Sequence, residues 1–385
     1  MAVVSNGRRR PLSDLAGEAE SRSLMGGLAE HLKSRIAKKG PLTVAQYMEE
    51  ALGHPRYGYY MASDPFGANG DFTTAPEISQ IFGELIGLWC AVVWRGMGAP
   101  SLLRLAELGP GRGTLLADAM RAGAKAPGFV EAVRLHLIET SPVLRRRQQE
   151  TLKDAALKHQ PSWHEDFDDV PDGSLLVIAN EFFDALPVRQ FQRTDDGWAE
   201  RLVDADPGKD GGFRFVLSDP VEPDMASELL SVPSGSLVET CAAAKDIVGD
   251  MARRVSTLGG AALIVDYGHA KSAAGETMQA VKDHAYHDPL DAPGDADLTA
   301  HVDFGALSGA ALKAGASVHG PLSQGAFLEN LGIHARAEAL IAAASGFQAA
   351  DIRAAVARLT SPGEMGTLFK VMAITHPELA PPPGF

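Results

Sequence analysis

Apolar residues along the chain follow first a helical and then an alternating helix and strand spacing, which predicts an α/β fold. In 24–51 and in 76–94 they recur every three or four residues, so we expect helices there, separated by an aromatic turn at 54–60 and a polar loop at 69–75. From Leu102 onward, short apolar runs of strand length alternate with helical stretches, as in a parallel sheet covered by helices. The expected strands are 102–108, 133–138, 162–164, 174–179 and 261–265.

A second pattern interrupts this core. Segments 187–193, 198–203 and 213–217 alternate apolar and polar residues, which predicts an antiparallel β excursion after the fourth strand. Residues 269–300 are rich in small residues, Asp, His, Pro and Gly, and a loop-rich stretch of this length is usually functional or disordered. Helices are expected at about 304–314, 324–331, 334–344 and 348–360, and a last antiparallel strand at 368–374 would close a seven-stranded sheet.

These patterns divide the chain into five parts. We expect a disordered tail at 1–23, an N-terminal helical segment at 24–95, a Rossmann-like core at 96–268 with a β insertion at about 187–217, a lid or substrate insertion at 269–345, and the last helix and strand of the core at 346–385.

Charge and composition exclude several classes of protein. The net charge of −14 argues against nonspecific binding to nucleic acid and would suit a cationic substrate, although solubility alone also explains it. Cys90 and Cys241 show no metal or disulfide spacing, which indicates a reducing compartment. There is no apolar run of about 18 residues, and Asp14 and Glu18 oppose a transit peptide. We expect a cytoplasmic protein without membrane insertion, and an oligomer is compatible with the sequence.

The most specific chemical motif is LLRLAELGPGRGTLL at 102–116. A strand ending in Glu107, a turn with Gly109, Gly111 and Gly113, and a helix form the start of a nucleotide-binding βαβ unit. An acid two residues before the first glycine is typical of S-adenosylmethionine (SAM) methyltransferases and not of the dehydrogenase motif. No Lys-Ser or Lys-Thr pair follows, which excludes a P-loop. A dinucleotide site and a purely structural turn stay open at this point.

Acids at the ends of the first three strands extend this site. Glu107 is expected to hold the cationic amino end of SAM, and its alternative role is to cap the turn. Glu139 is expected to bind the ribose hydroxyls, and its alternative role is to interact with a helix dipole. Asp166 could accept a hydrogen bond from the adenine amino group while Phe167 packs near the base.

A further set of acids follows the fourth and fifth strands. Asn180, Glu181 and Asp184 come after the fourth strand and Asp266 after the fifth, at the edge where open α/β sheets bind ligands. Acids at this edge could hold a guanidinium by charge-assisted, forked hydrogen bonds. The alternative is a cluster that caps a helix.

Two polar stretches flank these acids. Thr73 and Thr74 in NGDFTTA could close over the cofactor or merely cap a helix. The His- and Asp-rich residues 284–303 match no zinc spacing, so we expect no metal and prefer a lid or a substrate wall.

Together these residues resemble the MidA family of SAM-dependent methyltransferases, whose mitochondrial members act in assembly of respiratory complex I. The matching stretches keep their order from 41 to 303: PLTVAQYMEEALGHPRYGYY, GDFTTAPEISQIFGEL, LAELGPGRGTLLAD, LIETSPVLR, IANEFFDALPV, IVDYGH and DLTAHVDF. The resemblance implies a class I methyltransferase fold, SAM bound by the three glycines and Glu139, and Asn180-Glu181 at the methyl-acceptor edge. It also implies methylation of a protein arginine, in the mitochondrial case on a subunit of NADH dehydrogenase. No convincing presequence is present, which points to a bacterial relative and leaves the substrate open.

We therefore expect methyl transfer from SAM to an arginine of a partner protein. Catalysis would depend on holding the nucleophile and the methyl carbon about 3 Å apart. Because a guanidinium is protonated at neutral pH, Glu181, Asp184 or Asp266 should bind it and help take up the released proton. The rivals are a methyltransferase for a small molecule or another residue, an NAD-dependent oxidoreductase and a non-catalytic assembly factor.

Overall fold

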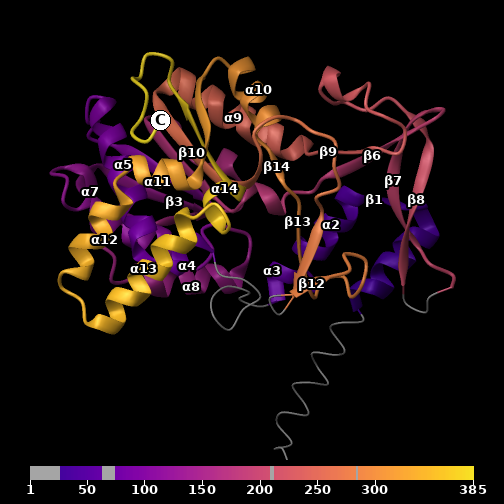
Figure 1. Ribbon diagram of the computed structural model, residues 1–385, viewed down its shortest axis with the longest axis horizontal. Helices are drawn as coiled ribbons and strands as arrows, with labels where there is room; N and C mark the ends of the chain where they lie inside the picture. Colours follow the sequence, from indigo (N-terminus) through magenta and orange to yellow (C-terminus); the bar gives the residue numbers. More distant parts are fainter. Residues whose placement is uncertain (1–26, 63–73, 209–211, 283–284) are drawn as a thin grey trace, which may run out of the picture.

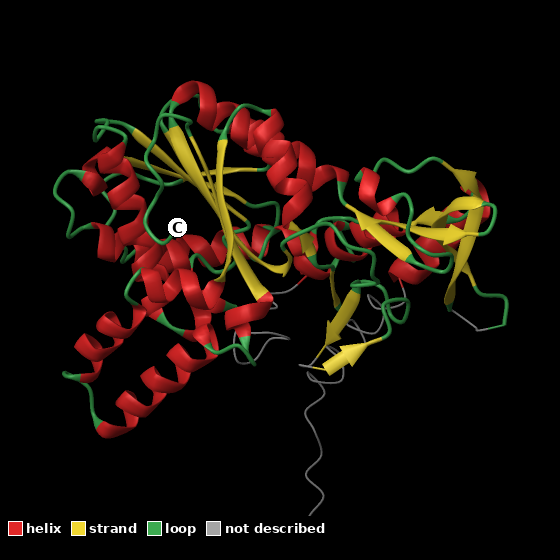
Figure 2. Cartoon of the chain, turned by 45° about the horizontal axis from the view of Figure 1, so that its top comes forward, coloured by secondary structure: helices red, strands yellow, loops and turns green. Residues whose placement is uncertain are grey.

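The computed structural model describes residues 27–62, 74–208, 212–282 and 285–385. These residues form two lobes, a larger one with helices on both faces of a sheet and a smaller one rich in strands (Figure 1, Figure 2). The layered arrangement of the larger lobe confirms the predicted α/β class.

One mixed sheet forms the centre of the large lobe. Its strands are β2 (Leu103–Leu108), β3 (Val133–Ile138), β4 (Ser162–His164), β5 (Leu175–Asn180), β10 (Gly260–His269), β14 (Val302–Asp303), β15 (Ser317–Ser323) and β16 (Phe369–Thr375). They lie in the order β15-β16-β10-β5-β2-β3-β4, and the short β14 pairs with the end of β10. All pairs are parallel except those of β16, which runs antiparallel to β10 and β15. The predicted seven-stranded path is therefore present.

The order of the strands reverses next to β2. The chain moves outward from β2 to β3 and β4, and then crosses to β5 and β10 on the other side. Such a switch point leaves room for a ligand at the carboxyl ends of the strands. The glycines that follow β2 lie at this point.

The sequence analysis missed β15. This strand contains Gly320-Pro321, and a proline argues against a strand because it cannot donate to the ladder. The register against β16 shifts between His319 and Leu322, so the proline lies where the pairing is interrupted. The predicted insertion at 269–345 is too long as a result, because residues 302–323 belong to the core sheet and its helices.

Helices cover the two faces of the sheet. One face carries α5 (Gln80–Gly96), α6 (Thr114–Gly123), α7 (Phe129–Ala132), α8 (Pro142–Leu152), α11 (Gln324–Asn330), α12 (Ile333–Ile341), α13 (Gly346–Thr360) and α14 (Met365–Leu368). The other face carries α9 (Ala242–Leu258) and α10 (Phe304–Lys313). Leu103 and Leu105 of β2 pack in the first layer and Ala106 and Leu108 in the second, as the period of two of a strand requires.

The single helix predicted at 76–94 is broken. α4 (Ala75–Ile78) ends at Ser79, whose φ of −159° and ψ of 132° are extended. The Ser79 hydroxyl accepts a hydrogen bond from the backbone N–H of Ile81 and so caps the start of α5. After the β excursion, β9 (Leu237–Thr240) directly precedes α9, which begins at Ala242.

The second lobe is assembled from three separate parts of the chain. Its main sheet contains β1 (Leu42–Thr43), β6 (Arg189–Thr194), β7 (Gly197–Ala205), β8 (Phe213–Val221) and β9, in the order β1-β7-β6-β9 with β8 beside β7. A smaller sheet contains β11 (Gln279–Lys282), β12 (Ala285–His287) and β13 (Asp297–Thr299). A helix over residues 27–39, α2 (Val44–Gly53) and α3 (Tyr59–Ala62) pack against them.

The N-terminal unit predicted at 24–95 is therefore divided between the lobes. Its first part joins the strands of the second lobe through the pairing of β1 with β7, whereas α4 and α5 belong to the large lobe. Nothing in the described ranges is a helix that is long and apolar enough to cross a membrane.

The contact between α5 and α6 gives a test of this packing. A Cβ added at Gly87 would lie 2.2 Å from the carbonyl oxygen of Ala119, so Gly87→Ala forces the two helices apart. We expect its free energy of unfolding to fall by about 1–3 kcal/mol. Gly249→Ala in α9 is the matched control, because a Cβ there meets nothing within 4 Å, and it should gain about 0.5–1 kcal/mol. Equal stability of the two variants in chemical denaturation would contradict the packing.

Candidate active site

The glycine turn, Gly109–Gly113, connects β2 to α6 at the switch point of the sheet. Gly109, Gly111 and Gly113 have φ values of +61°, +51° and +81°, which favour glycine. The backbone N–H of Gly109 donates to the carbonyl of Ile138 at the end of β3, at 3.1 Å. A Cβ at Gly109 would lie 2.9 Å from the ring of Phe182. The turn is thus fitted closely between the ends of β3 and β5.

Glu107 places a carboxyl group in the interior next to this turn. The residue is 2% exposed, and its Oε2 atom has no hydrogen-bond partner. Burial raises the pKa of Glu107 to about 8. An orphaned carboxyl oxygen of this kind is costly unless a ligand supplies a donor. A cationic amino group would supply both a donor and the opposite charge, so the residues present fit the amino end of SAM.

Glu139 is held beside the glycine turn. Its Oε1 accepts from the N–H of Ser141 at 2.8 Å, and its Oε2 accepts from Gln148 at 3.1 Å. The same amide nitrogen of Gln148 donates to the carbonyl of Gly111 at 2.8 Å. Glu139 therefore lies next to the turn and not out in solvent, and its role as a ribose ligand stays a prediction.

Gln148 is a site residue that the sequence analysis missed. Its side-chain oxygen accepts from the indole N–H of Trp163 at 2.8 Å, so one buried amide connects three elements. Nothing in its residue type distinguishes it from its polar neighbours. The signal was its spacing, because Leu144, Gln148 and Leu152 form the buried stripe of α8 at intervals of four.

The residues after β4 are arranged differently from the prediction. Asp166 is exposed and caps a short 3-10 helix by accepting from the N–H of Asp168 at 3.1 Å. Phe167 packs in the core, with the Arg254 guanidinium 4.7 Å from its ring centroid. We correct the expectation that Phe167 packs near an adenine base, because its ring is enclosed by core side chains and Arg254. Asp166 remains a predicted adenine contact.

The two threonines predicted to close over the cofactor are only partly described. Thr73 lies outside the described residues. Thr74 is buried and occupies the N-cap position of α4, although its side chain makes no capping hydrogen bond. Its role at the cofactor stays a prediction.

The acceptor edge, Asn180–Asp184, follows β5. Glu181 has a φ of +50°, a strained value for a side-chain-bearing residue and one that often marks functional sites. Its Oε1 accepts from the N–H of Ala75 at 2.9 Å and from the amide of Asn180 at 3.2 Å. Burial raises the pKa of Glu181 to about 7. The Oδ1 atom of Asn180, a residue 8% exposed, has no hydrogen-bond partner.

Asp266 does not act as predicted. Its Oδ2 accepts from the backbone N–H groups of Phe182, Phe183 and Asp184 at 3.2, 2.9 and 3.3 Å, and its Oδ1 accepts from that of Tyr267 at 2.9 Å. The residue is 0% exposed. No position is left for a substrate, so Asp266 fixes the acceptor edge and does not contact the reacting groups. Asp184 itself is buried and hydrogen-bonds Tyr267, and burial raises its pKa to about 6.

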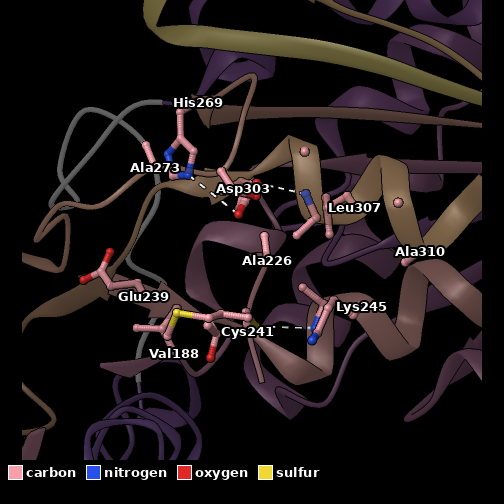
Figure 3. Close-up of a pocket in the computed structure, with 18 of the residues that line it drawn as sticks. Val188, Ala226, Glu239, Cys241, Lys245, His269, Ala273, Asp303, Leu307 and Ala310 are labelled. Atoms are coloured by element: carbon pink, nitrogen blue, oxygen red, sulfur yellow. Dashed lines mark hydrogen bonds and ion pairs between the residues drawn. The ribbon is translucent and has the colours of Figure 1, made fainter. Parts of the chain in front are cut away.

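A cavity of about 830 Å³ lies between the lobes, beside α9 and α10. Figure 3 shows His269 and Asp303 on one wall, with Val188, Glu239 and Cys241 opposite. The glycine turn and Glu139 do not line it, and Phe183 is the acceptor-edge residue that reaches it. The cavity is therefore separate from the proposed cofactor position.

One group of side chains has the types and proximity of metal ligands within the ranges described. It contains His31, Glu50 and His54 of the second lobe. Glu50 is already paired with Arg35, and Nδ1 of His54 accepts two backbone N–H groups. A cation would have to displace these partners, so we assign no metal there.

Comparison with known proteins finds relatives over most of the chain. The model of a family described as "Putative S-adenosyl-L-methionine-dependent methyltransferase" matches residues 85–322. The chain is 41% identical to "Protein arginine methyltransferase NDUFAF7, mitochondrial" of Danio rerio, over 92% of this chain and 88% of that protein. It is 42% identical to the Drosophila melanogaster homologue, over 94% and 88%.

A crystal structure from Burkholderia thailandensis, bound to S-adenosyl-homocysteine (SAH), superposes with a TM-score of 0.81 and 29% identity, over 99% of this chain and 97% of that one. The predicted cofactor class, fold and family resemblance are confirmed by these matches. The expected cytoplasmic location is wrong, because the relatives at about 40% identity are mitochondrial proteins.

The raised pKa of Glu107 predicts that cofactor binding depends on pH. In the free protein the carboxyl is protonated below about pH 8, and a bound ammonium group favours its ionised form, so binding releases a proton. SAH affinity should rise between pH 6 and 8, by up to about tenfold per pH unit. Glu107→Gln should bind more weakly at pH 8 and lose this slope.

Calorimetry in two buffers of different ionisation enthalpy counts the released protons. The number of protons released by the wild type minus the number released by Glu107→Gln gives the contribution of Glu107, separate from those of Glu139 and Glu181. Identical proton release by both proteins would contradict the assignment.

Proposed function

The chain belongs to the MidA family of SAM-dependent methyltransferases, and from this premise we propose that it transfers a methyl group to an arginine side chain of a partner protein. The observation that carries the proposal is the pair Asn180 and Glu181 at the end of β5. Their unpartnered amide oxygen and buried carboxyl lie at the same switch point as the glycine turn.

The cofactor supplies an electrophilic methyl group on a positively charged sulfur. Glu107 would hold its amino end, the backbone of the glycine turn its carboxylate, and Glu139 its ribose. Asp266 keeps the acceptor edge in place through the three backbone N–H groups of Phe182, Phe183 and Asp184. These groups bring the acceptor nitrogen and the methyl carbon together, which is the main requirement of a direct displacement.

Glu181 would bind the arginine and receive its proton. A guanidinium offers five N–H donors, and the free oxygen of Asn180 and the carboxyl of Glu181 are acceptors for them. When the N–C bond forms and the C–S bond breaks, the sulfonium becomes a neutral thioether and the methylated nitrogen loses one proton. A carboxyl whose pKa is raised to about 7 can accept that proton near neutral pH and pass it to water.

The class of partner is proposed from the relatives. Those at about 40% identity are named protein arginine methyltransferases, which supports a protein arginine as the acceptor. The family resemblance implies, more specifically, a subunit of the NADH dehydrogenase type. We propose such a subunit as the substrate.

Paired substitutions test the two halves of the site. Glu181→Gln should lower methyl transfer by about 10²–10⁴-fold and leave SAH affinity unchanged. Gly111→Val should abolish SAH binding, because its side chain occupies the turn at a positive φ. Glu131→Gln, an exposed acid of α7, is the control and should keep full activity.

The assay combines tritiated SAM with extract of cells that lack the protein, followed by mass spectrometry of methylated arginines. Full activity of Glu181→Gln would refute the acceptor assignment. Label found only in free metabolites would show that the substrate is a small molecule.

A further inference from the structure

Two carboxyl groups and two tyrosines meet at the junction of the two lobes. Asp184 and Tyr267 belong to the large lobe and hydrogen-bond each other. Tyr60 and Asp297 belong to the second lobe, and the Tyr60 hydroxyl donates to Asp297 Oδ1 at 2.7 Å. Thr299 hydrogen-bonds Tyr267 and lies on β13, the strand that also carries Asp297. We call these five residues the junction network.

The fold brings the network to the acceptor edge. The backbone N–H of Ala300, just after β13, donates to the carbonyl of Asp184 at 2.9 Å. In Figure 1, β13 and α3 lie on the side of the second lobe toward the large lobe, and these elements carry Asp297 and Tyr60. Asp184 and Asp297 both raise the pKa of the Tyr60 hydroxyl, in addition to its burial. Asp184 of the large lobe and Asp297 of the second lobe therefore both lie close enough to Tyr60 to affect its hydroxyl electrostatically.

A buried acid elsewhere in this chain shows one way in which a buried carboxylate is neutralised. Glu84 of α5 is buried and accepts hydrogen bonds from both Arg121 and Arg336. In the ranges that the structure describes, Asp184 and Asp266 form no ion pair with any lysine or arginine. Buried acids are normally paired, because an unpaired buried charge is costly. The partner of Asp184 is therefore expected from outside the chain.

A second observation also points to a missing donor. The Oδ1 atom of Asn180 is buried without a partner, although its own amide nitrogen is bonded to Glu181. In the sheet, Asn180 is directly opposite Val265, the residue before Asp266 and Tyr267. A polar acceptor without a donor thus lies at the strand ends that also carry Glu181, Asp184 and Tyr267.

We infer that Asp297 and Tyr60 form the second-lobe wall of the acceptor site and bind the substrate guanidinium from the side opposite Glu181. This inference rests on the proposed function. A guanidinium is planar and has five N–H donors, so it can hydrogen-bond the carboxyl groups of Glu181 and Asp297 on two sides. It can also stack on the flat face of a tyrosine ring. It follows that residues 269–300 contribute a substrate wall through β13 and are not simply a cover over the cofactor.

Substitutions in the full-length protein test the wall. Nα-acetyl-arginine amide is the probe, and its binding is measured by NMR at saturating SAH. Asp297→Asn removes the charge at the wall and should weaken binding about 10- to 100-fold, with SAH affinity unchanged. Tyr60→Phe removes the hydroxyl that donates to Asp297 and should weaken binding in the same direction by a smaller factor.

Asp295→Asn is the matched control in the same segment. Asp295 lies 3.6 Å from Lys282 and is not part of the junction network, so this variant should bind the probe like the wild type. Nα-acetyl-lysine amide should bind at least about tenfold more weakly than the arginine probe, because a lysine lacks the planar fork of donors.

The outcomes separate this inference from the proposed function. Loss of SAH binding in Asp297→Asn would indicate misfolding. The affinity of Tyr60→Phe for the arginine probe then decides whether the wall exists. The wall is refuted if both variants bind the arginine probe like the wild type, if the wild type does not bind the probe, or if the lysine probe binds equally well. If the wild type methylates arginines of extract proteins and Asp297→Asn binds the arginine probe as tightly as the wild type, only the wall is refuted and the proposed function stands. A wild type that binds no SAH would refute the proposed function.

Discussion

The acceptor edge depends on the carboxylate of Asp266, on which four backbone N–H groups converge. Three of them come from consecutive residues after β5, so one buried side chain at the end of β10 determines the path of a neighbouring loop. Phe182 is thereby directed against Gly109, and Asp184 toward Tyr267. The geometry on both the cofactor side and the acceptor side therefore follows from the pairing of β5 with β10.

Local patterns in the sequence predicted the parts of the fold that local forces determine. β5 is a continuous apolar run, β2 and β3 are mostly apolar, and these three strands lie where the sequence predicted them, whereas β10 extends four residues beyond its predicted end. β15 was missed because its Gly-Pro pair resembles a turn, and only its pairing with β16 makes it a strand. The predicted boundaries of the second lobe were wrong because β1 pairs with β7, which is far from it in the sequence. Pairing over such distances leaves no trace in a short window of residues.

The candidate site shows the same limit at the level of single side chains. The glycine turn, Glu139 and the Asn180-Glu181 pair could be located by motif and by position at the strand ends. Asp266 and Asp184 look equivalent in the sequence, and only their hydrogen bonds distinguish a loop anchor from an unpaired acid. Gln148 is identified by its burial and Asp297 by its approach from another lobe. Motifs thus indicate which residue types are present, and tertiary contacts determine what each one does.

The position of β16 has a consequence for the order of folding. This strand, the last of the chain, lies between β10 and β15 in the interior of the sheet. During synthesis β10 is complete about a hundred residues before β16. Until β16 is made, one side of the β10 backbone has no strand to pair with. An unpaired apolar strand can pair with other chains until β16 is added. β16 is thus the strand that completes the sheet of the catalytic lobe.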